Sequence, residues 1–113
     1  MKKVVLNIDT SDRNKSVVGL EIDGKSEKQE VATPLGSGTA VLSAIETLFY
    51  KNKVKMSDIS EIGVATGPGS YTGLRVGASI ANTLSWLLKI PINGKPAGSI
   101  ITPQYTATDN HRQ

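Results

Sequence analysis

The sequence predicts an α/β lobe built on a mixed five-stranded sheet. Three observations favour this class: a short run rich in β-branched residues at 3–9, an Asp-Gly pair between two extended stretches, and two helical segments that alternate with short apolar runs. A length of 113 residues favours one domain. Apolar residues at 38% and charged residues at 20% are typical of a globular chain and argue against a disordered one.

The first three elements are expected to be strands. KVVLNID at 3–9 is short, apolar and bounded by polar residues, which is typical of a buried strand. Asp23 and Gly24 supply the positive φ angles of a type I′ turn, so they predict a hairpin. We expect the strands of this hairpin at about 16–22 and 25–32.

Helices and strands alternate in the rest of the chain. A helix is predicted at 38–52, where apolar residues recur on one stripe and Ser37 or Thr39 is expected to cap the start. We expect a fourth strand, a second helix and a fifth strand at 61–65, about 70–88 and 91–94.

The predicted order is β-β-β-α-β-α-β, with the first strand in the centre of the sheet. It is the plan of one lobe of the ribonuclease-H-like fold, which the actin-like ATPases and sugar kinases also use. We expect this lobe to span residues 1–97. Residues 98–113 carry no pattern and are expected to form a disordered tail.

The composition excludes several kinds of site. The chain has no cysteine, which removes disulfides, thiolate metal ligands and cysteine nucleophiles. Its single histidine, His111, lies near the end of the chain, so no converging set of metal ligands is expected. The apolar runs are too short for a signal peptide or a membrane span, which favours a cytoplasmic protein without a membrane partner. The net charge of +3 comes from scattered lysines, so direct tRNA binding is only an alternative, to be tested by its salt dependence.

The most distinctive stretch is TGPGSYTGLR at 66–75. It lacks the lysine of a P-loop and the spacing of a dinucleotide-binding fingerprint. Two interpretations therefore remain. The loop binds an anion at the start of the following helix, or its glycines permit a tight turn and a close approach of that helix to the sheet.

Arg75 follows this loop in the first turns of the second helix. The helix dipole disfavours a cation there, so either a bound anion or a carboxylate partner is indicated. Asp9 and Asp58 are the candidate carboxylates.

The second helix is apolar on two sides, which predicts that both sides are covered. One side suits the sheet. Gly73, Gly77 and Ala81 are four residues apart and predict a shallow groove that another helix can approach closely. That helix belongs either to a second chain or to the first helix of this chain.

Two stretches, SDISEIGVATGPGSYTGLRVG at 57–77 and IANTLSWLLKIPINGKP at 80–96, closely resemble the TsaB (YeaZ) family. The resemblance covers about residues 3–97, and the run from Gly67 to Gly77 is its most specific part. It implies a non-catalytic scaffold in the bacterial synthesis of N6-threonylcarbamoyladenosine (t6A) at position 37 of tRNA. The implied partners are a TsaD-like catalytic subunit and a TsaE-like ATPase, with tRNA contacted only indirectly. Family members usually have two lobes, of which we expect this chain to form the first.

The resemblance also implies where the functional residues lie. A dimer surface, shared with a second copy or with a TsaD-like partner, is expected on the two helices; its residues are Val41, Leu42, Ile45, Leu48, Leu74, Gly77, Ala78, Ala81 and Leu84. The fold group turns its first strand toward nucleotide phosphates, and the matching candidates for an anion or nucleotide here are Asp9, Thr10, Gly67, Gly69, Ser70 and Arg75.

The fold group prefers a glycine-rich turn after its first strand, which the stretch DTSDRN at 9–14 lacks, so no intact ATP site and no cofactor are expected. The resemblance implies a chain without a catalytic or metal site. The alternative is a nucleotide-binding ATPase or kinase half-domain of the actin-like group. Calorimetric titration with ATP distinguishes the two, because the alternative requires measurable heat of binding.

Overall fold

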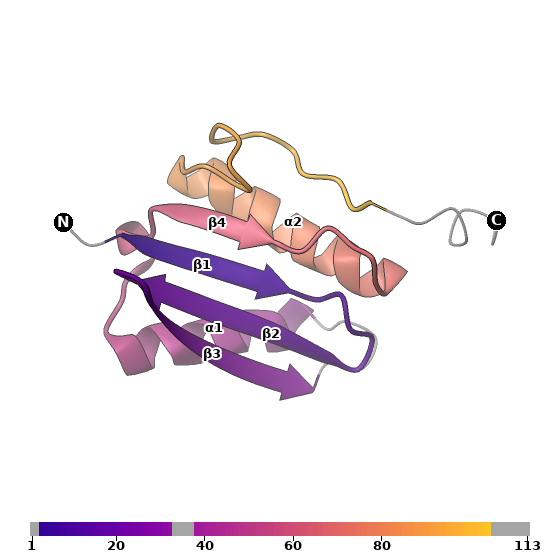
Figure 1. The fold of residues 1–113 in the computed structure, drawn as a ribbon, viewed down its shortest axis with the longest axis horizontal. Helices are drawn as coiled ribbons and strands as arrows, with labels where there is room; N and C mark the ends of the chain where they lie inside the picture. The colour runs from indigo at the N-terminus through magenta and orange to yellow at the C-terminus, as the bar shows by residue number, and fades with distance from the viewer. Residues whose placement is uncertain (1–2, 33–37, 105–113) are drawn as a thin grey trace.

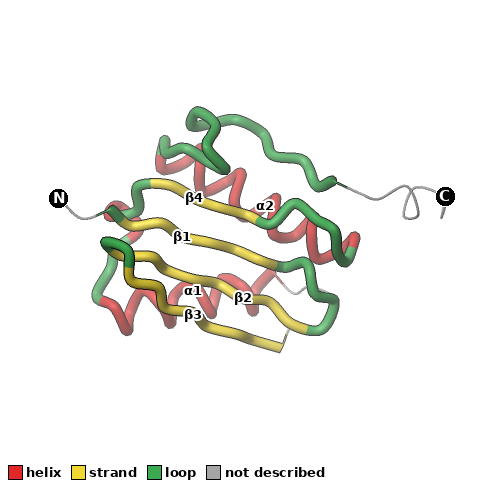
Figure 2. Tube along the Cα trace, in the orientation of Figure 1, coloured by secondary structure: helices red, strands yellow, loops and turns green. Residues whose placement is uncertain are grey.

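The computed structural model describes residues 3–32 and 38–104, which form a four-stranded sheet in the order β3-β2-β1-β4 (Figure 1). The strands are β1 (Val4–Asp9), β2 (Lys15–Ile22), β3 (Lys25–Ala32) and β4 (Glu61–Val64). The helices are α1 (Gly38–Asn52), the short 3₁₀ helix η1 (Met56–Asp58) and α2 (Tyr71–Leu88). These bounds agree closely with the first six predicted elements (Figure 2).

The first three strands form an antiparallel meander, as predicted. Asp23 and Gly24 join β2 to β3 with φ angles of 51° and 87°, which are the positive values that a type I′ turn requires. β1 pairs antiparallel with β2 and parallel with β4, so it is a central strand.

The prediction of a fifth strand at 91–94 is wrong. Residues 91–94 make one isolated parallel bridge to the sheet, between Ile92 and Ile62, and one antiparallel bridge, between Ile92 and Lys95. Pro91 has no backbone N–H to donate, and the positive φ angles of Asn93 (49°) and Gly94 (77°) turn the chain away immediately afterwards. The sheet in the described residues therefore has four strands.

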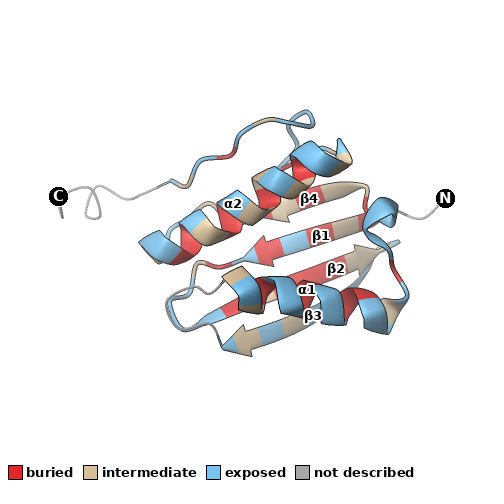
Figure 3. Ribbon diagram, turned by 180° about the vertical axis from the view of Figure 1, so that it is seen from behind, coloured by how far each residue is buried: buried red, intermediate tan, exposed pale blue. Residues whose placement is uncertain are grey.

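Both helices cover the same face of the sheet (Figure 3). α1 packs mainly on β2 and β3, whereas α2 packs on β4 and β1, and the two helices contact each other only slightly. Alternate strand residues such as Leu6, Ile8 and Leu20 point into the core between the sheet and the helices. The opposite face carries no helix in the described part of the chain.

The segment that follows Ala97 packs against the lobe as far as residue 104. Ile101 is only 6% exposed and joins the core. The side-chain amide of Asn82 on α2 donates to the Ile101 carbonyl (3.0 Å) and accepts from the Ile101 N–H (2.8 Å). The Gln104 N–H donates to the carbonyl of Thr66 (2.7 Å). Residues 105–113, which hold the rest of the predicted tail, lie outside the described residues.

Neither α1 nor α2, nor any other helix in the described ranges, is both long enough and apolar enough to cross a membrane.

Candidate functional site

The glycine-rich loop at 66–70 joins β4 to α2 at the edge where the parallel strands β1 and β4 both end. Ser70 caps α2, since its hydroxyl accepts the N–H of Gly73 (3.2 Å). The backbone N–H of Ser70 donates to the carbonyl of Ser11 at the end of β1 (2.7 Å). The start of α2 is therefore fixed to the loop after β1 by backbone contacts.

Thr10 lies against α2 at Gly73 and Gly77, where a larger residue would not fit. This threonine is buried, and its hydroxyl donates to the carbonyl of Gly73 (2.5 Å). A methyl group added at Gly73 would collide with the Thr10 carbonyl oxygen, and one added at Gly77 would collide with the Thr10 hydroxyl. Both glycines thus allow α2 to lie directly against the end of β1. This geometry supports the close-packing interpretation of the loop.

Several candidates for an anion or nucleotide site contact other parts of the chain itself. Asp9 accepts two hydrogen bonds from Ser11, one from its N–H (2.9 Å) and one from its hydroxyl (2.6 Å). A Cβ at Gly67 would meet the Gln104 carbonyl oxygen, and one at Gly69 would meet Ser11. The chain itself fills the space beside Gly67 and Gly69, whereas Asp9 is exposed and borders a hollow on the sheet face without helices.

Arg75 has neither of the predicted carboxylate partners, Asp9 and Asp58. Its guanidinium lies 5.4 Å from the centre of the Tyr71 ring and donates to the Tyr71 hydroxyl (3.3 Å). Among the described residues the ion pairs are Lys3–Glu61 and Lys15–Glu30. The dipole cost of a cation in this turn is offset by the contact with the aromatic ring of Tyr71.

Ser70→Ala should lower the free energy of unfolding by about 1 kcal/mol, because the Gly73 N–H then loses its acceptor. Urea unfolding monitored by circular dichroism measures the change. Ser79→Ala, at an exposed position in the middle of the same helix, is the matched control and should leave stability nearly unchanged. Equal losses in the two variants would contradict the capping role.

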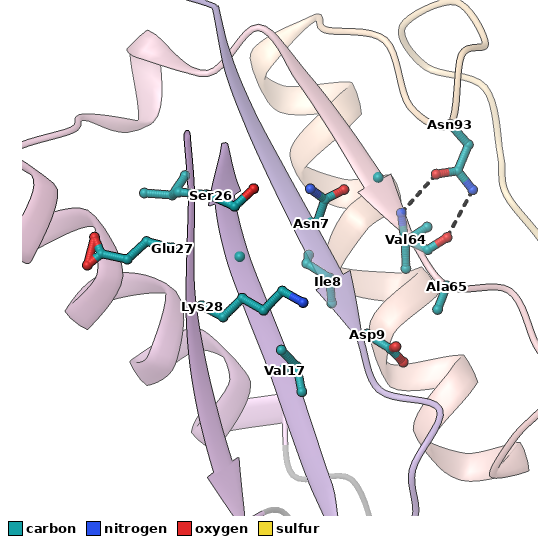
Figure 4. Close-up of a pocket in the computed structure, with 13 residues that line it drawn as sticks. Asn7, Ile8, Asp9, Val17, Ser26, Glu27, Lys28, Val64, Ala65 and Asn93 are labelled. Carbon is teal, nitrogen blue, oxygen red and sulfur yellow. Dashed lines mark hydrogen bonds between the residues drawn. The ribbon is translucent and has the colours of Figure 1, made fainter. Parts of the chain in front are cut away.

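A hollow of about 490 Å³ lies on the sheet face that carries no helix (Figure 4). Gly19 and Gly63 flank Asn7 in register on either side, and the Lys28 side chain extends across Gly19. Asn93 borders the hollow, and its amide pairs with both the N–H and the carbonyl of Val64 (2.8 and 3.1 Å). The sequence analysis did not find this hollow, although the glycines in neighbouring strands were its signal.

Most of the predicted interface residues are buried inside the lobe of the single chain. Val41, Ile45, Leu48, Leu74, Gly77, Ala78 and Ala81 face the lobe's own core; Leu84 is half-buried and Leu42 is 45% exposed. The groove predicted along Gly73, Gly77 and Ala81 is filled by β1. An apolar stripe does not indicate by itself whether it packs on the same chain or on another one.

The exposed sides of the two helices carry another set of apolar residues, which shares only Leu42 with the predicted interface; we call this set the outer helix face. It consists of Leu42, Tyr71, Val76, Trp86 and Leu87. Trp86 is 67% exposed and Leu87 is 59% exposed, which is unusual for such large apolar side chains. A second hollow, of about 430 Å³, lies on this face; it is lined by Gly38, Tyr71, Thr72, Arg75, Val76, Ser79 and Ile80. The sequence analysis recognised the second apolar side of α2 but did not assign its residues to the interface.

Metal-binding residues do not gather anywhere in the described ranges: no group of three or more His, Cys, Asp or Glu side chains is close enough to hold an ion. The single histidine of the sequence, His111, lies outside these ranges.

The described residues form a single α/β lobe, in which two helices cover one face of a mixed sheet. The model of the TsaD family, tRNA N6-adenosine threonylcarbamoyltransferase, matches residues 38–94, which include α1, β4 and α2. The chain belongs to this family, and its relatives place it with the TsaB/YeaZ proteins.

Three comparisons illustrate the relationship. The chain is 32% identical to the tRNA threonylcarbamoyladenosine biosynthesis protein TsaB of Bacillus subtilis, over 91% of this chain and 50% of that protein. It is 36% identical to TsaB of Buchnera aphidicola subsp. Schizaphis graminum, over 54% of this chain and 29% of that protein. The structure of YeaZ from Pseudomonas aeruginosa matches with a TM-score of 0.74 at 24% identity, over 80% of this chain and 42% of that one. This chain thus spans half or less of the length of these relatives, and the YeaZ structure supports the fold alone.

Proposed function

We propose that this chain is a non-catalytic interaction subunit in the synthesis of N6-threonylcarbamoyladenosine on tRNA. In this role its outer helix face binds a TsaD-like catalytic subunit or a second copy of the chain. A TsaE-like ATPase acts in the same assembly, and tRNA is contacted only through the complex. The proposed site of action is the cytoplasm, where tRNA is modified.

The observation that carries this proposal is the exposed apolar surface on α1 and α2. The two helices leave Leu42, Trp86 and Leu87 in water on the side away from the sheet. Large apolar side chains that stay exposed on neighbouring helices are typical of a surface that binds another protein. Both helices lie within the segment that the family model matches.

The contacts of the glycine loop support a structural role rather than a catalytic one. Ser70, Gly73 and Thr10 use their polar groups to hold α2 against β1. A site for phosphoryl or acyl transfer needs donors aimed at the reacting group, and these donors are directed at the chain's own backbone. The distinctive sequence of the loop is then a requirement for positioning α2, and with it the outer helix face.

The test is to mix the chain with a TsaD-like protein and to measure mass by light scattering at tens of micromolar. A 1:1 complex is expected, because burying the apolar outer helix face stabilises it. Leu42→Asp should raise the dissociation constant of this complex by roughly tenfold or more, because the new carboxylate loses its hydration on binding. Glu27→Lys, at an exposed position on the edge strand β3, is the control and should leave affinity nearly unchanged. Separate proteins at this concentration would contradict the proposal.

A further inference from the structure

We infer that this lobe contacts the phosphate backbone of tRNA at one end of its sheet, which we call the basic end. This end carries the exposed side chain of Tyr50 and five exposed lysines, Lys25, Lys51, Lys53, Lys55 and Lys89. The inference rests on the proposed function, because tRNA reaches this surface in the assembled complex. There the chain adds a second contact to the one that the catalytic subunit makes.

Lysines that are scattered in the sequence meet at this end because of the sheet topology. β1 and β4 run parallel and begin there, and both helices run back from the opposite end, so they finish there too (Figure 1). The Asp23 N–H donates to the carbonyl of Lys3 (3.1 Å), which holds the β2–β3 turn beside the start of β1. The Ser60 N–H donates to the carbonyl of Val4 (2.7 Å), which holds the segment after α1 in the same place.

The carboxylates near the basic end do not neutralise its ammonium groups. In the described ranges no ion pair includes any of the five lysines. Asp23 accepts the backbone N–H of Lys3 (3.0 Å), and Asp58 accepts that of Lys55 (2.9 Å). Glu61 pairs with the ammonium group of Lys3 (3.1 Å). These carboxylates thus bind backbone groups or Lys3, and the end keeps an excess of positive charge.

Helix dipoles account for only part of this charge. The end of a helix carries about half a negative charge, and its influence falls off within the last turn. Lys51 in the last turn of α1 and Lys89 at the end of α2 complement the two dipoles. Lys53 and Lys55 lie beyond α1, and Lys25 begins β3. The ammonium groups of these three lysines therefore attract a polyanion from outside the chain.

Tyr50 adds a surface on which a base can stack. It lies in the last turn of α1, away from the buried residues of that helix, and is 87% exposed. The Lys53 N–H donates to the Tyr50 carbonyl (3.3 Å), so Lys51 and Lys53 both lie next to this residue. An exposed ring among lysines is typical of surfaces that bind single-stranded nucleic acid. The expected partner is an unpaired stretch of tRNA, whose bases are free to stack.

The contact should be weak for the chain alone. Lysine–phosphate contacts without base recognition give dissociation constants of about 1–100 μM at physiological salt. In the complex the catalytic subunit holds the same tRNA, so the contact becomes intramolecular and adds to the affinity. We therefore expect the complex to bind tRNA more tightly than the TsaD-like protein does by itself.

The experiment is a fluorescence anisotropy titration of a labelled tRNA transcript with the complex, at several salt concentrations. The double variant Lys53→Gln, Lys55→Gln should lower the affinity about tenfold and reduce the slope of log affinity against log salt by about one per lysine. The control, Arg13→Gln with Lys28→Gln, removes the same charge from exposed positions outside the basic end. It should change neither the affinity nor the slope.

Tyr50→Ala tests stacking separately from charge. It should lower the affinity for tRNA by about fivefold or more without changing the salt slope, because a base loses its platform while the lysines remain. Tyr50→Phe keeps the ring and should bind as tightly as the unaltered chain. A fully paired RNA duplex, whose bases are not free to stack, should not distinguish Tyr50→Ala from the unaltered chain.

The outcomes separate this inference from the proposed function. A complex whose tRNA affinity and salt slope are unaffected by the two lysine changes would overturn the inference and leave the proposed function standing. If these changes instead abolish the complex in light scattering, the basic end meets an acidic protein surface, and the inference is overturned as well.

If the unaltered chain forms no complex, the proposed function fails and the titration is made with the chain alone at submillimolar concentration. Weaker binding of the double lysine variant would then support the inference, and equal binding would overturn it.

Discussion

Gly77→Ala should destabilise the lobe by about 1–3 kcal/mol, although alanine normally stabilises a helix relative to glycine. The added methyl group would collide with the hydroxyl of Thr10, which is buried and already bonded to Gly73. Gly73→Ala should cost still more, because there the collision is with the carbonyl oxygen of Thr10, which a side-chain rotation cannot relieve. Urea unfolding followed by circular dichroism measures both losses.

Three further variants make this prediction specific. Gly38→Ala is the control: its methyl group would be in ordinary contact with Val76, at 3.8 Å, and should leave stability unchanged or slightly raised. Thr10→Ala removes the hydroxyl that Gly77→Ala meets. The double variant should therefore be more stable than the sum of the two single losses predicts. Additive losses would show that Gly77 is not constrained by Thr10.

A chain that ends at Ala97 should lose about 2–4 kcal/mol of unfolding free energy relative to one that ends at Gln104. The shorter chain lacks the buried side chain of Ile101 and leaves the amide of Asn82 without its two backbone partners. It also loses the hydrogen bond from Gly98 to the hydroxyl of Ser85. The midpoints of urea unfolding of the two chains provide the comparison.

The internal control is the full 113-residue chain, which should unfold at the same midpoint as the chain that ends at Gln104. Ile101→Ala in the full chain should reproduce part of the loss, because the segment stays docked through Asn82 but leaves a cavity. Equal stability of the chains ending at Ala97 and Gln104 would mean that the segment from residue 98 onward contributes nothing to the lobe.

The physical role of the glycine loop follows from its contacts. Residues 66–77 are the most distinctive part of the resemblance to the TsaB family, and a glycine-rich turn before a helix is often associated with phosphate binding. In this lobe Gly73 and Gly77 are needed where α2 crosses Thr10, and Ser70 is needed to cap the helix. The loop sets the position of α2 relative to β1. Any partner that binds the outer helix face depends on that position.

Local rules were sufficient to predict the meander and both helices. A type I′ turn needs two positive φ angles, and Asp23-Gly24 adopts them regardless of what lies around it. The apolar stripe of 38–52 has the helical period, and this stripe is the side that the sheet covers. Each signal lies within a few residues of the element that it specifies.

The errors concern contacts between distant segments. Residues 91–94 have an extended pattern, but Pro91 and the turn at Asn93 and Gly94 allow only one bridge to β4. Residues 98–104 have no pattern, yet Asn82 and Thr66 supply hydrogen-bond partners that hold them in place. No local feature of either segment indicates which partner it will meet.

The sequence by itself determined the order of the first six predicted elements, the hairpin turn, the two helices and, through residues 66–77, the family. Only the tertiary structure decided which side of each helix faces outward. Gly77 and Ala81 face the chain's own sheet, whereas Trp86 and Leu87 remain in solvent. The physical reason is that burial depends on what lies opposite a side chain. The helical period fixes which residues share a stripe, but the path of β1 and the docking of residues 98–104 determine which stripe is covered.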